Sequence, residues 1–190
     1  MNKLIHLLIL LSLPWSAGQA QLCRRDSIPE STPSSRFTLA VDRNTATDTY
    51  THLEWQRCPW GQVIGKNADN IDTCIGRARV GDWGSALRAA AAPGAGWRVP
   101  NIKELISIVD VQCVDPPFNR EIFPAAWSGI PDPTLPVAYW SSTPGTGYGT
   151  NAAAGVPPTP LAWAMFTHDG TTMRFTRAQH LFAVFVRSVP

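Results

Sequence analysis

The sequence predicts a compact α+β domain built on a twisted antiparallel sheet with two short helices and two disulfides. Runs of β-prone residues lie at both ends of the region that follows residue 35, and two segments with helix-capping residues lie between them. These helices do not alternate regularly with strands, which disfavours a doubly wound parallel sheet. An even number of cysteines, four in all, completes the pattern.

Residues 1–20 have the features of a cleaved signal peptide. A basic Lys3 precedes an apolar run over residues 4–13, and Gly18 and Ala20 are small residues placed before a cut ahead of Gln21. The apolar run is too short for a permanent membrane span. We therefore expect residues 21–190 to form one domain that is periplasmic, exposed on the cell surface or extracellular.

The charge of this expected domain is close to neutral. Sixteen basic and fourteen acidic residues occur in the whole chain, and one of the basic residues, Lys3, belongs to the signal segment. A general nucleic-acid binder would have a clear basic excess, so we expect no nucleic-acid partner. Nearly all the basic residues are arginines, which suit ion pairs and stacking on aromatic rings, and we expect many of them to be structural.

The cysteines are expected to form disulfides because the chain is expected to be exported. Three pairings are open to four cysteines. We favour Cys58–Cys74, which closes a polar loop, and Cys23–Cys113, which ties the N-terminal segment to the region after the second helix. Their spacing matches no zinc site, and we expect neither a metal nor another cofactor.

The first half of the domain predicts a hairpin, a loop and two helices. The runs RFTLAV and DTYTHLEWQ predict an antiparallel hairpin, and residues 58–82 lack periodicity and predict a disulfide-bracketed loop. DWGSALRAAAA predicts a helix capped by Asp82. NIKELISIV predicts a second one, in which Asn101 and Glu104 form a capping box ahead of an apolar face.

The C-terminal third predicts mainly strands. VAYWSS reads as a strand, and residues 143–160 read as a long loop rich in glycine, proline and alanine. LAWAMFT and TTMRF predict a hairpin whose turn uses positive φ values at Asp169 and Gly170. The last run, LFAVFVRS, is apolar enough to lie centrally as a strand.

The segment GWRVPNIKEL, which begins the second helix, has a structural and a functional interpretation. Trp97, Arg98 and Glu104 are of types that can line a pocket. We favour the structural interpretation, in which Trp97 is buried against the sheet, Arg98 pairs with a neighbour, and Glu104 closes the helix cap. Pro100 then lies just outside the helix and keeps Val99 extended.

Candidate ligand-binding residues lie in the C-terminal third. The run Tyr139, Trp140, Ser141 and Ser142 is either a platform for a sugar or an alternating strand with Trp140 inside. The long loop carries Tyr148 and Asn151 among small residues, and loops of this kind often bind ligands. A basic group of Arg174, Arg177 and His180 follows, which would receive an anion or pair with acidic residues. The candidate ligand-binding set is Tyr139, Ser142, Tyr148, Asn151, Arg174, Arg177 and His180.

No residues are assigned to catalysis. A hydrolytic triad needs a nucleophile, a base and an orienting group in contact, and the expected domain has His52, His168 and His180 but no Gly-x-Ser-x-Gly elbow. The segment NADNID, residues 67–72, has enough oxygen atoms for a weak ion site, but such loops are usually only solvated.

Several motifs, in order, resemble the bacterial Lcl C-terminal-domain family: LEWQRC, GWRVPNIKELISIVD, YWSST, AWAMF and VRSV. The resemblance spans almost all of residues 21–190. It implies a C-type-lectin-like fold in a group that also contains the formylglycine-generating enzymes. The family takes its name from a collagen-like adhesin that binds sulfated glycosaminoglycans, but no Gly-X-Y stretch occurs here and the charge is nearly neutral.

The sequence therefore favours an exported, non-enzymatic binding domain that recognises a carbohydrate or another surface ligand. The alternative is a structural or assembly module that binds another envelope or pilus protein. A third interpretation, an enzyme related to the formylglycine-generating enzymes, needs a reactive cysteine, whereas these cysteines are better explained as disulfides.

Overall fold

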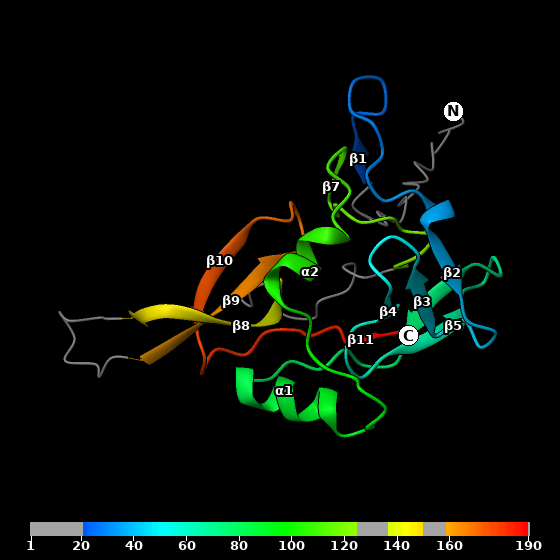
Figure 1. Cartoon of the computed structure of the whole chain (residues 1–190). Coiled ribbons are helices and arrows are strands. Elements are labelled where there is room, and N and C mark those ends of the chain that lie inside the picture. Colours follow the sequence, from blue (N-terminus) through cyan, green and yellow to red (C-terminus); the bar gives the residue numbers. More distant parts are fainter. Residues whose placement is uncertain (1–20, 125–136, 150–158, 190) are drawn as a thin grey trace, which may run out of the picture.

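The computed structural model describes residues 21–124, 137–149 and 159–189, so the expected signal segment and Asn151 lie outside the described residues. Within these ranges the chain forms two α-helices and small antiparallel sheets, and the α+β prediction is confirmed (Figure 1). No helix in the described part is long and apolar enough to cross a membrane.

One sheet has the strand order β11-β4-β3-β2. Its strands are β2 (Phe37–Leu39), β3 (Thr45–Asp48), β4 (Leu53–Gln56) and β11 (Val186–Ser188). The predicted two-stranded hairpin is therefore a three-stranded meander, because β3 occupies the segment between the two predicted runs. A short 3-10 turn, η1 (Ser34–Arg36), leads into β2.

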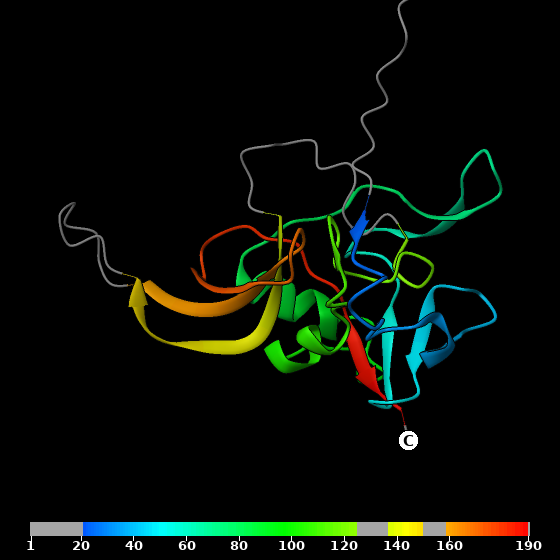
Figure 2. The same ribbon diagram turned by 90° about the horizontal axis from the view of Figure 1, so that it is seen from above.

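The second sheet consists of β8 (Ala138–Gly149), β9 (Thr159–Phe166) and β10 (Thr172–Thr176), in the order β10-β9-β8. Figure 2 shows β8 and β9 as a curved arm that extends away from the helices. The predicted loop at 143–160 is thus wrong over residues 143–149, which continue β8 through two register shifts. In the β9–β10 turn, Gly170 has a positive φ, whereas Asp169 does not.

Both faces of this second sheet are covered where β8 begins. Tyr139 packs in one apolar cluster with Leu105 and Ile108, and its neighbour Trp140 packs in another with Ala86 and Ala90. Leu105 and Ile108 lie in or just after helix α2 (Ile102–Ser107), whereas Ala86 and Ala90 lie in helix α1 (Trp83–Ala91). Tyr139 is only 2% exposed, so its assignment to a ligand-binding surface is wrong.

The segment before β11 runs through the centre of the domain. Residues 181–186 are all buried, as the apolar run predicted. Phe182 exchanges backbone hydrogen bonds with β8, and Ala183 and Phe185 accept from Trp60 and Gln56 on the other side. This segment therefore joins the two large sheets, although its regular strand is limited to Val186–Ser188.

Both helices are capped as predicted. The Asp82 carboxylate accepts from the Ser85 N–H at 2.6 Å. At α2, the Asn101 side chain accepts from the Glu104 N–H, and the Glu104 carboxylate accepts from the Asn101 N–H at 2.7 Å. These reciprocal bonds satisfy amide groups that have no partner within the helix.

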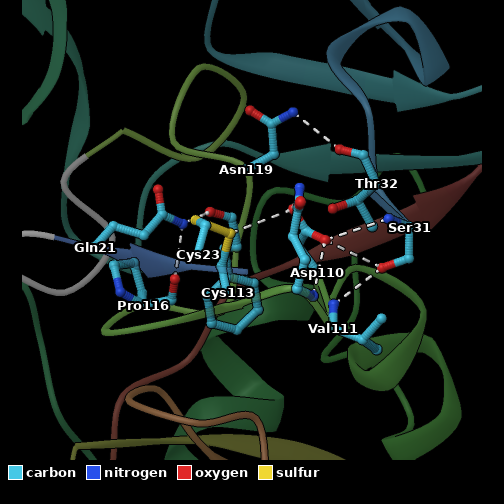
Figure 3. The surroundings of a disulfide bond; sticks show 11 residues. Gln21, Cys23, Ser31, Thr32, Asp110, Val111, Cys113, Pro116 and Asn119 are labelled. Atoms are coloured by element: carbon cyan, nitrogen blue, oxygen red, sulfur yellow. Dashed lines mark hydrogen bonds between the residues drawn. A yellow bond between two sulfur atoms is a disulfide. The ribbon is translucent and has the colours of Figure 1, made fainter. Parts of the chain in front are cut away.

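Both predicted disulfides are present. Cys23–Cys113 joins β1 (Leu22–Cys23) to β7 (Cys113–Val114), which pair as a two-stranded ladder. Figure 3 shows further bonds around it: Gln21 donates to the Pro116 carbonyl, and Asn119 donates to the Thr32 carbonyl. The N-terminal segment is therefore held against the region that follows α2.

The second disulfide, Cys58–Cys74, supports a hairpin that the sequence analysis missed. Residues 58–82 were expected to be a loop, but β5 (Val63–Lys66) pairs with β6 (Asp72–Ile75). The strands of this hairpin are partly exposed on both faces, so they lack the alternation of apolar and polar residues that predicts a strand.

Candidate functional site

The segment Trp97–Pro100, together with Glu104, connects α2 to β11 and has a structural role. Arg98 makes two hydrogen bonds to the Glu104 carboxylate, at 2.7 and 2.6 Å, and its backbone pairs with Val186. Trp97 is half-buried rather than buried, and Arg187 lies over its ring. Val99 and Pro100 are the buried residues of this segment.

Other arginines also stack on aromatic rings, as their number predicted. One such pair lies at the start of α1: the Arg177 guanidinium carbon is 4.1 Å from the centroid of the Trp83 ring. Arg177 Nε also donates to the Leu161 carbonyl at 3.1 Å, and Trp83 Nε1 donates to the Ser141 carbonyl at 2.8 Å. Both side chains are therefore fixed in position while remaining partly exposed.

A second pair lies on the β9–β10 hairpin, on the other face of the sheet, because Trp163 and Arg174 alternate with Ala162 and Phe175, which pack on the α1 side. Arg174 and Trp163 face each other across the two strands, and the guanidinium carbon is 5.8 Å from the ring centroid. Arg174 also donates to the Thr146 carbonyl at 2.8 Å. Leu161 lies near both arginines. Its carbonyl accepts from Arg177, and a Cβ placed on Gly145 would contact both Leu161 and the Arg174 side chain.

A third pair, Arg79 with Trp60, lies against the start of α1. A Cβ at Gly81 would lie 3.1 Å from the Trp60 ring and 3.3 Å from the Cβ of Ser85, so the ring lies against the start of the helix. Arg88, one turn further along α1, donates to the Ser85 hydroxyl.

We give the name arginine–tryptophan surface to the set of these residues around the start of α1 and both faces of the edge strand β10: Trp60, Arg79, Trp83, Arg88, Trp163, Arg174, Arg177 and His180. None of its four arginines forms a salt bridge with a described residue. The carboxylate at its centre, Asp82, caps α1, and the hydrogen bond from the Ser85 N–H lowers its pKa. The cationic groups therefore exceed the anionic ones at this surface.

The arrangement suits binding of an extended anion. Arginine presents a planar set of donors that matches carboxylate and sulfate groups. Stacking on a ring orders the guanidinium before a ligand arrives, which reduces the entropy lost on binding. The ring edges offer apolar area to the C–H groups of a sugar.

The sequence pattern of the Lcl C-terminal domain family matches residues 44–187, which include every member of the arginine–tryptophan surface. The chain belongs to the Lcl C-terminal domain family. No curated protein and no solved structure matches the chain.

The predicted binding residues of this Lcl C-terminal domain separate into groups. Of the predicted basic group, Arg177 and His180 lie at the start of α1, and Arg174 lies on the other face of the edge strand β10. Ser142 lies elsewhere, at the start of α2, where its N–H donates to the Pro100 carbonyl. Tyr148 lies in β8, and its side chain is outside the described atoms.

Sequence reasoning missed Trp60, Arg79, Trp83, Arg88 and Trp163 as neighbours of the predicted basic group. They come from three segments that are far apart in the chain. The composition indicated that arginines would suit stacking on aromatic rings, but it did not indicate which residues meet, because the partners come together only in the tertiary fold.

Proposed function

We propose that this Lcl C-terminal domain is an exported, non-enzymatic binding domain that recognises an acidic carbohydrate through the arginine–tryptophan surface. The observation that carries the proposal is the set of four arginines without a carboxylate partner, three of them stacked on tryptophan rings. Near-neutral total charge does not oppose this, because these four arginines form no salt bridge with a described residue and so remain locally unneutralised.

Export supports the choice of a surface ligand. All four cysteines are in disulfides, which persist in oxidising compartments such as the periplasm or the cell exterior. A polysaccharide of an envelope or of a host surface is a ligand that an exported domain meets. The pairing also leaves no thiol for the cysteine chemistry of the formylglycine-generating enzymes.

A second candidate function is an assembly module that binds another envelope protein. Two apolar cross-strand pairs favour it, because large side chains on exposed strands often mark contacts between proteins. Val63 opposes Ile75 in the β5–β6 hairpin, and Leu22 opposes Val114 in the β1–β7 ladder. All four side chains are more than one third exposed.

A glycan array tests the proposed function. The probe is residues 21–190 with both disulfides formed, applied to neutral, carboxylated and sulfated glycans at physiological salt. The proposal predicts selective binding to acidic glycans that persists at this salt concentration, since screening removes weak, non-specific attraction. A blank array would contradict it and favour the assembly module.

A further inference from the structure

A groove lies beside β2, in a different part of the fold from the arginine–tryptophan surface. The groove encloses about 450 Å³ between the edge of the meander, the tip of the β5–β6 hairpin and residues 120–122. In Figure 1, β2, β3 and β5 lie at the right, on the other side of the view from β10.

One carboxylate at the base of this groove binds three cationic side chains. Asp72 accepts from Arg43 Nη2 at 2.6 Å, from Arg57 Nη1 at 3.0 Å and from Lys66 Nζ at 2.7 Å. The Asp72 side chain is 8% exposed and that of Arg57 is fully buried, whereas Arg43 and Lys66 are about half exposed. A single negative charge therefore holds three positive ones together.

The donors of the three cations are not used to the same extent. Arg57 uses four of its five N–H donors, because besides Asp72 it donates to the carbonyls of Ile122, Arg43 and Glu121. Lys66 has three N–H donors and uses one on Asp72, and Arg43 binds Asp72 through Nε and Nη2 alone. Both exposed cations thus keep N–H groups that can bind a further anion.

Arg120 adds a fourth cation to the groove. Arg120 is exposed and makes no hydrogen bond or salt bridge with a described residue. Its neighbour Glu121 is already engaged, since it accepts from the Ser34 hydroxyl at 2.5 Å. Arg43, Lys66, Arg57 and Arg120 together face two carboxylates, which leaves two positive charges in excess around the groove.

The remaining walls are apolar. Phe37 and Leu39 lie two residues apart on β2 and so point to the same side of the strand, and Ile122 lies beside them. Ile71, which closes the hairpin tip, is 60% exposed. A ligand that filled this space would place apolar atoms against these side chains and an acidic group against the cations.

We propose that this groove binds a carboxylate carried by an apolar group of about the size of a leucine or phenylalanine side chain. The volume lies in the range of sites for small ligands, about 300–1,000 Å³. Such chemistry is shared by free aliphatic or aromatic acids and by the carboxyl end of a polypeptide whose last residue is apolar. This site is independent of the arginine–tryptophan surface, so it stands even where no glycan binds.

Titration of the ¹⁵N- and methyl-labelled domain (residues 21–190) with N-acetyl-leucine, followed by NMR, tests the proposal. Shift changes are expected at Leu39, Ile71 and Ile122 and at the backbone of Lys66. N-acetyl-leucinamide, which lacks the charge, is expected to bind at least about fivefold more weakly. Equal binding of acid and amide, or no shifts in the groove, would overturn the proposal.

Two conservative variants locate the anion contact and leave the buried Arg57–Asp72 pair in place. Lys66→Gln and Arg120→Gln are each expected to weaken binding of N-acetyl-leucine by about three- to tenfold. Arg77→Gln and Lys103→Gln, exposed cations outside the groove, are the matched controls and are expected to leave it unchanged. A uniform loss over all four variants would indicate only non-specific charge attraction and would overturn the proposal.

Two further probes distinguish the sources of the ligand. One is 4-methylpentanoate, a free acid with the leucine side-chain shape, and the other is an acetylated tetrapeptide that ends in leucine. Equal affinities would assign the groove to small free acids. A tetrapeptide affinity at least about tenfold higher would assign it to a polypeptide end, and both results support the site.

Discussion

The guanidinium of Arg187 lies over the ring of Trp97, with 4.8 Å between its central carbon and the ring centroid. Arg187 also donates to the Glu54 carboxylate at 2.6 Å. Trp97 belongs to the turn before α2, Arg187 to β11 and Glu54 to β4. Arg187 therefore connects the turn, β11 and the meander. This contact gives Trp97, in the turn before α2, an architectural role.

Removal of the Trp97 ring is expected to destabilise the domain moderately. A fully buried aromatic residue contributes about 3–5 kcal/mol, but Trp97 is half-buried, so Trp97→Ala should lower the free energy of unfolding by about 2 kcal/mol. A double-mutant cycle with Arg187→Gln, measured by denaturant melts, should give a coupling of about 0.5–1 kcal/mol. Strict additivity would show that the stacking is not energetically significant.

The capping box and the ion pair at α2 can be separated by two substitutions. Glu104→Gln keeps an oxygen that accepts from the Asn101 N–H but loses the charged pair with Arg98, and should cost about 1 kcal/mol. Glu104→Ala loses both and should cost about 2 kcal/mol. If the two variants melted alike, the cap would not contribute beyond the ion pair.

Neutralising Asp72 should be the most damaging of the charge changes. Asp72→Asn leaves the buried Arg57 with two other cations and no counter-charge, and we expect a loss of about 3 kcal/mol in thermal or denaturant melts. The matched control is Asp69→Asn at the exposed hairpin tip, with an expected change below about 0.5 kcal/mol. Comparable losses for both variants would contradict the structural role of the network.

Acid should destabilise the domain through a few carboxylates. Burial raises the pKa of Glu104, but the hydrogen bonds from Arg98 and from the Asn101 N–H outweigh it and hold that pKa below its ordinary value. The hydrogen bond from Arg43 is the largest influence on Asp72, and its pKa is also lowered.

The direction of the pH dependence follows from these lowered values. The unfolded chain takes up protons near pH 4, before the folded domain does, so the stabilisation is complete above that pH and is lost as the pH falls further. Unfolding free energies measured between pH 7 and pH 3 should therefore decrease below about pH 5, and Asp72→Asn should flatten the curve. A curve with the same slope in the variant would contradict this assignment.

The two disulfides should stabilise to different extents. Their cysteines are 90 and 16 residues apart, and loop-closure entropy gives about 4–5 kcal/mol for Cys23–Cys113 and about 3 kcal/mol for Cys58–Cys74. Paired Cys→Ser replacements followed by denaturant melts measure each contribution. A larger loss at Cys58–Cys74 would show that it holds the β5–β6 hairpin in place beyond its effect on the unfolded chain.

Local signals in the sequence predicted local structure well. The capping box of Asn101 and Glu104 is a contact between residues three apart, so both partners can be recognised from the sequence alone. Gly170 likewise marks its turn because few other residues accept a positive φ.

The assignment of Tyr139 failed for a tertiary reason. An alternating strand normally has one buried and one exposed face, but β8 has α2 on one side and α1 on the other. Tyr139 and Trp140 are therefore both buried, on opposite faces. No pattern within YWSS distinguishes this case from a strand with an open face.

The candidate surface was only partly predictable. Arg174, Arg177 and His180 are close in the chain and were grouped from the sequence. Arg79 and Arg88 join them because the central segment pairs Leu181 with Gly81 and so brings the start of α1 to β10. A contact across one hundred residues of chain leaves no local trace.

The role of the arginine–tryptophan surface is tested most directly by comparing two double variants against an acidic glycan selected from the array. Arg174→Gln/Arg177→Gln should reduce the affinity at physiological salt by at least about tenfold, since two charge-assisted contacts are lost. Arg24→Gln/Arg25→Gln, which makes the same change in net charge outside the surface, should leave it within about twofold. Equal losses in both double variants, or none in the first, would contradict recognition at this surface.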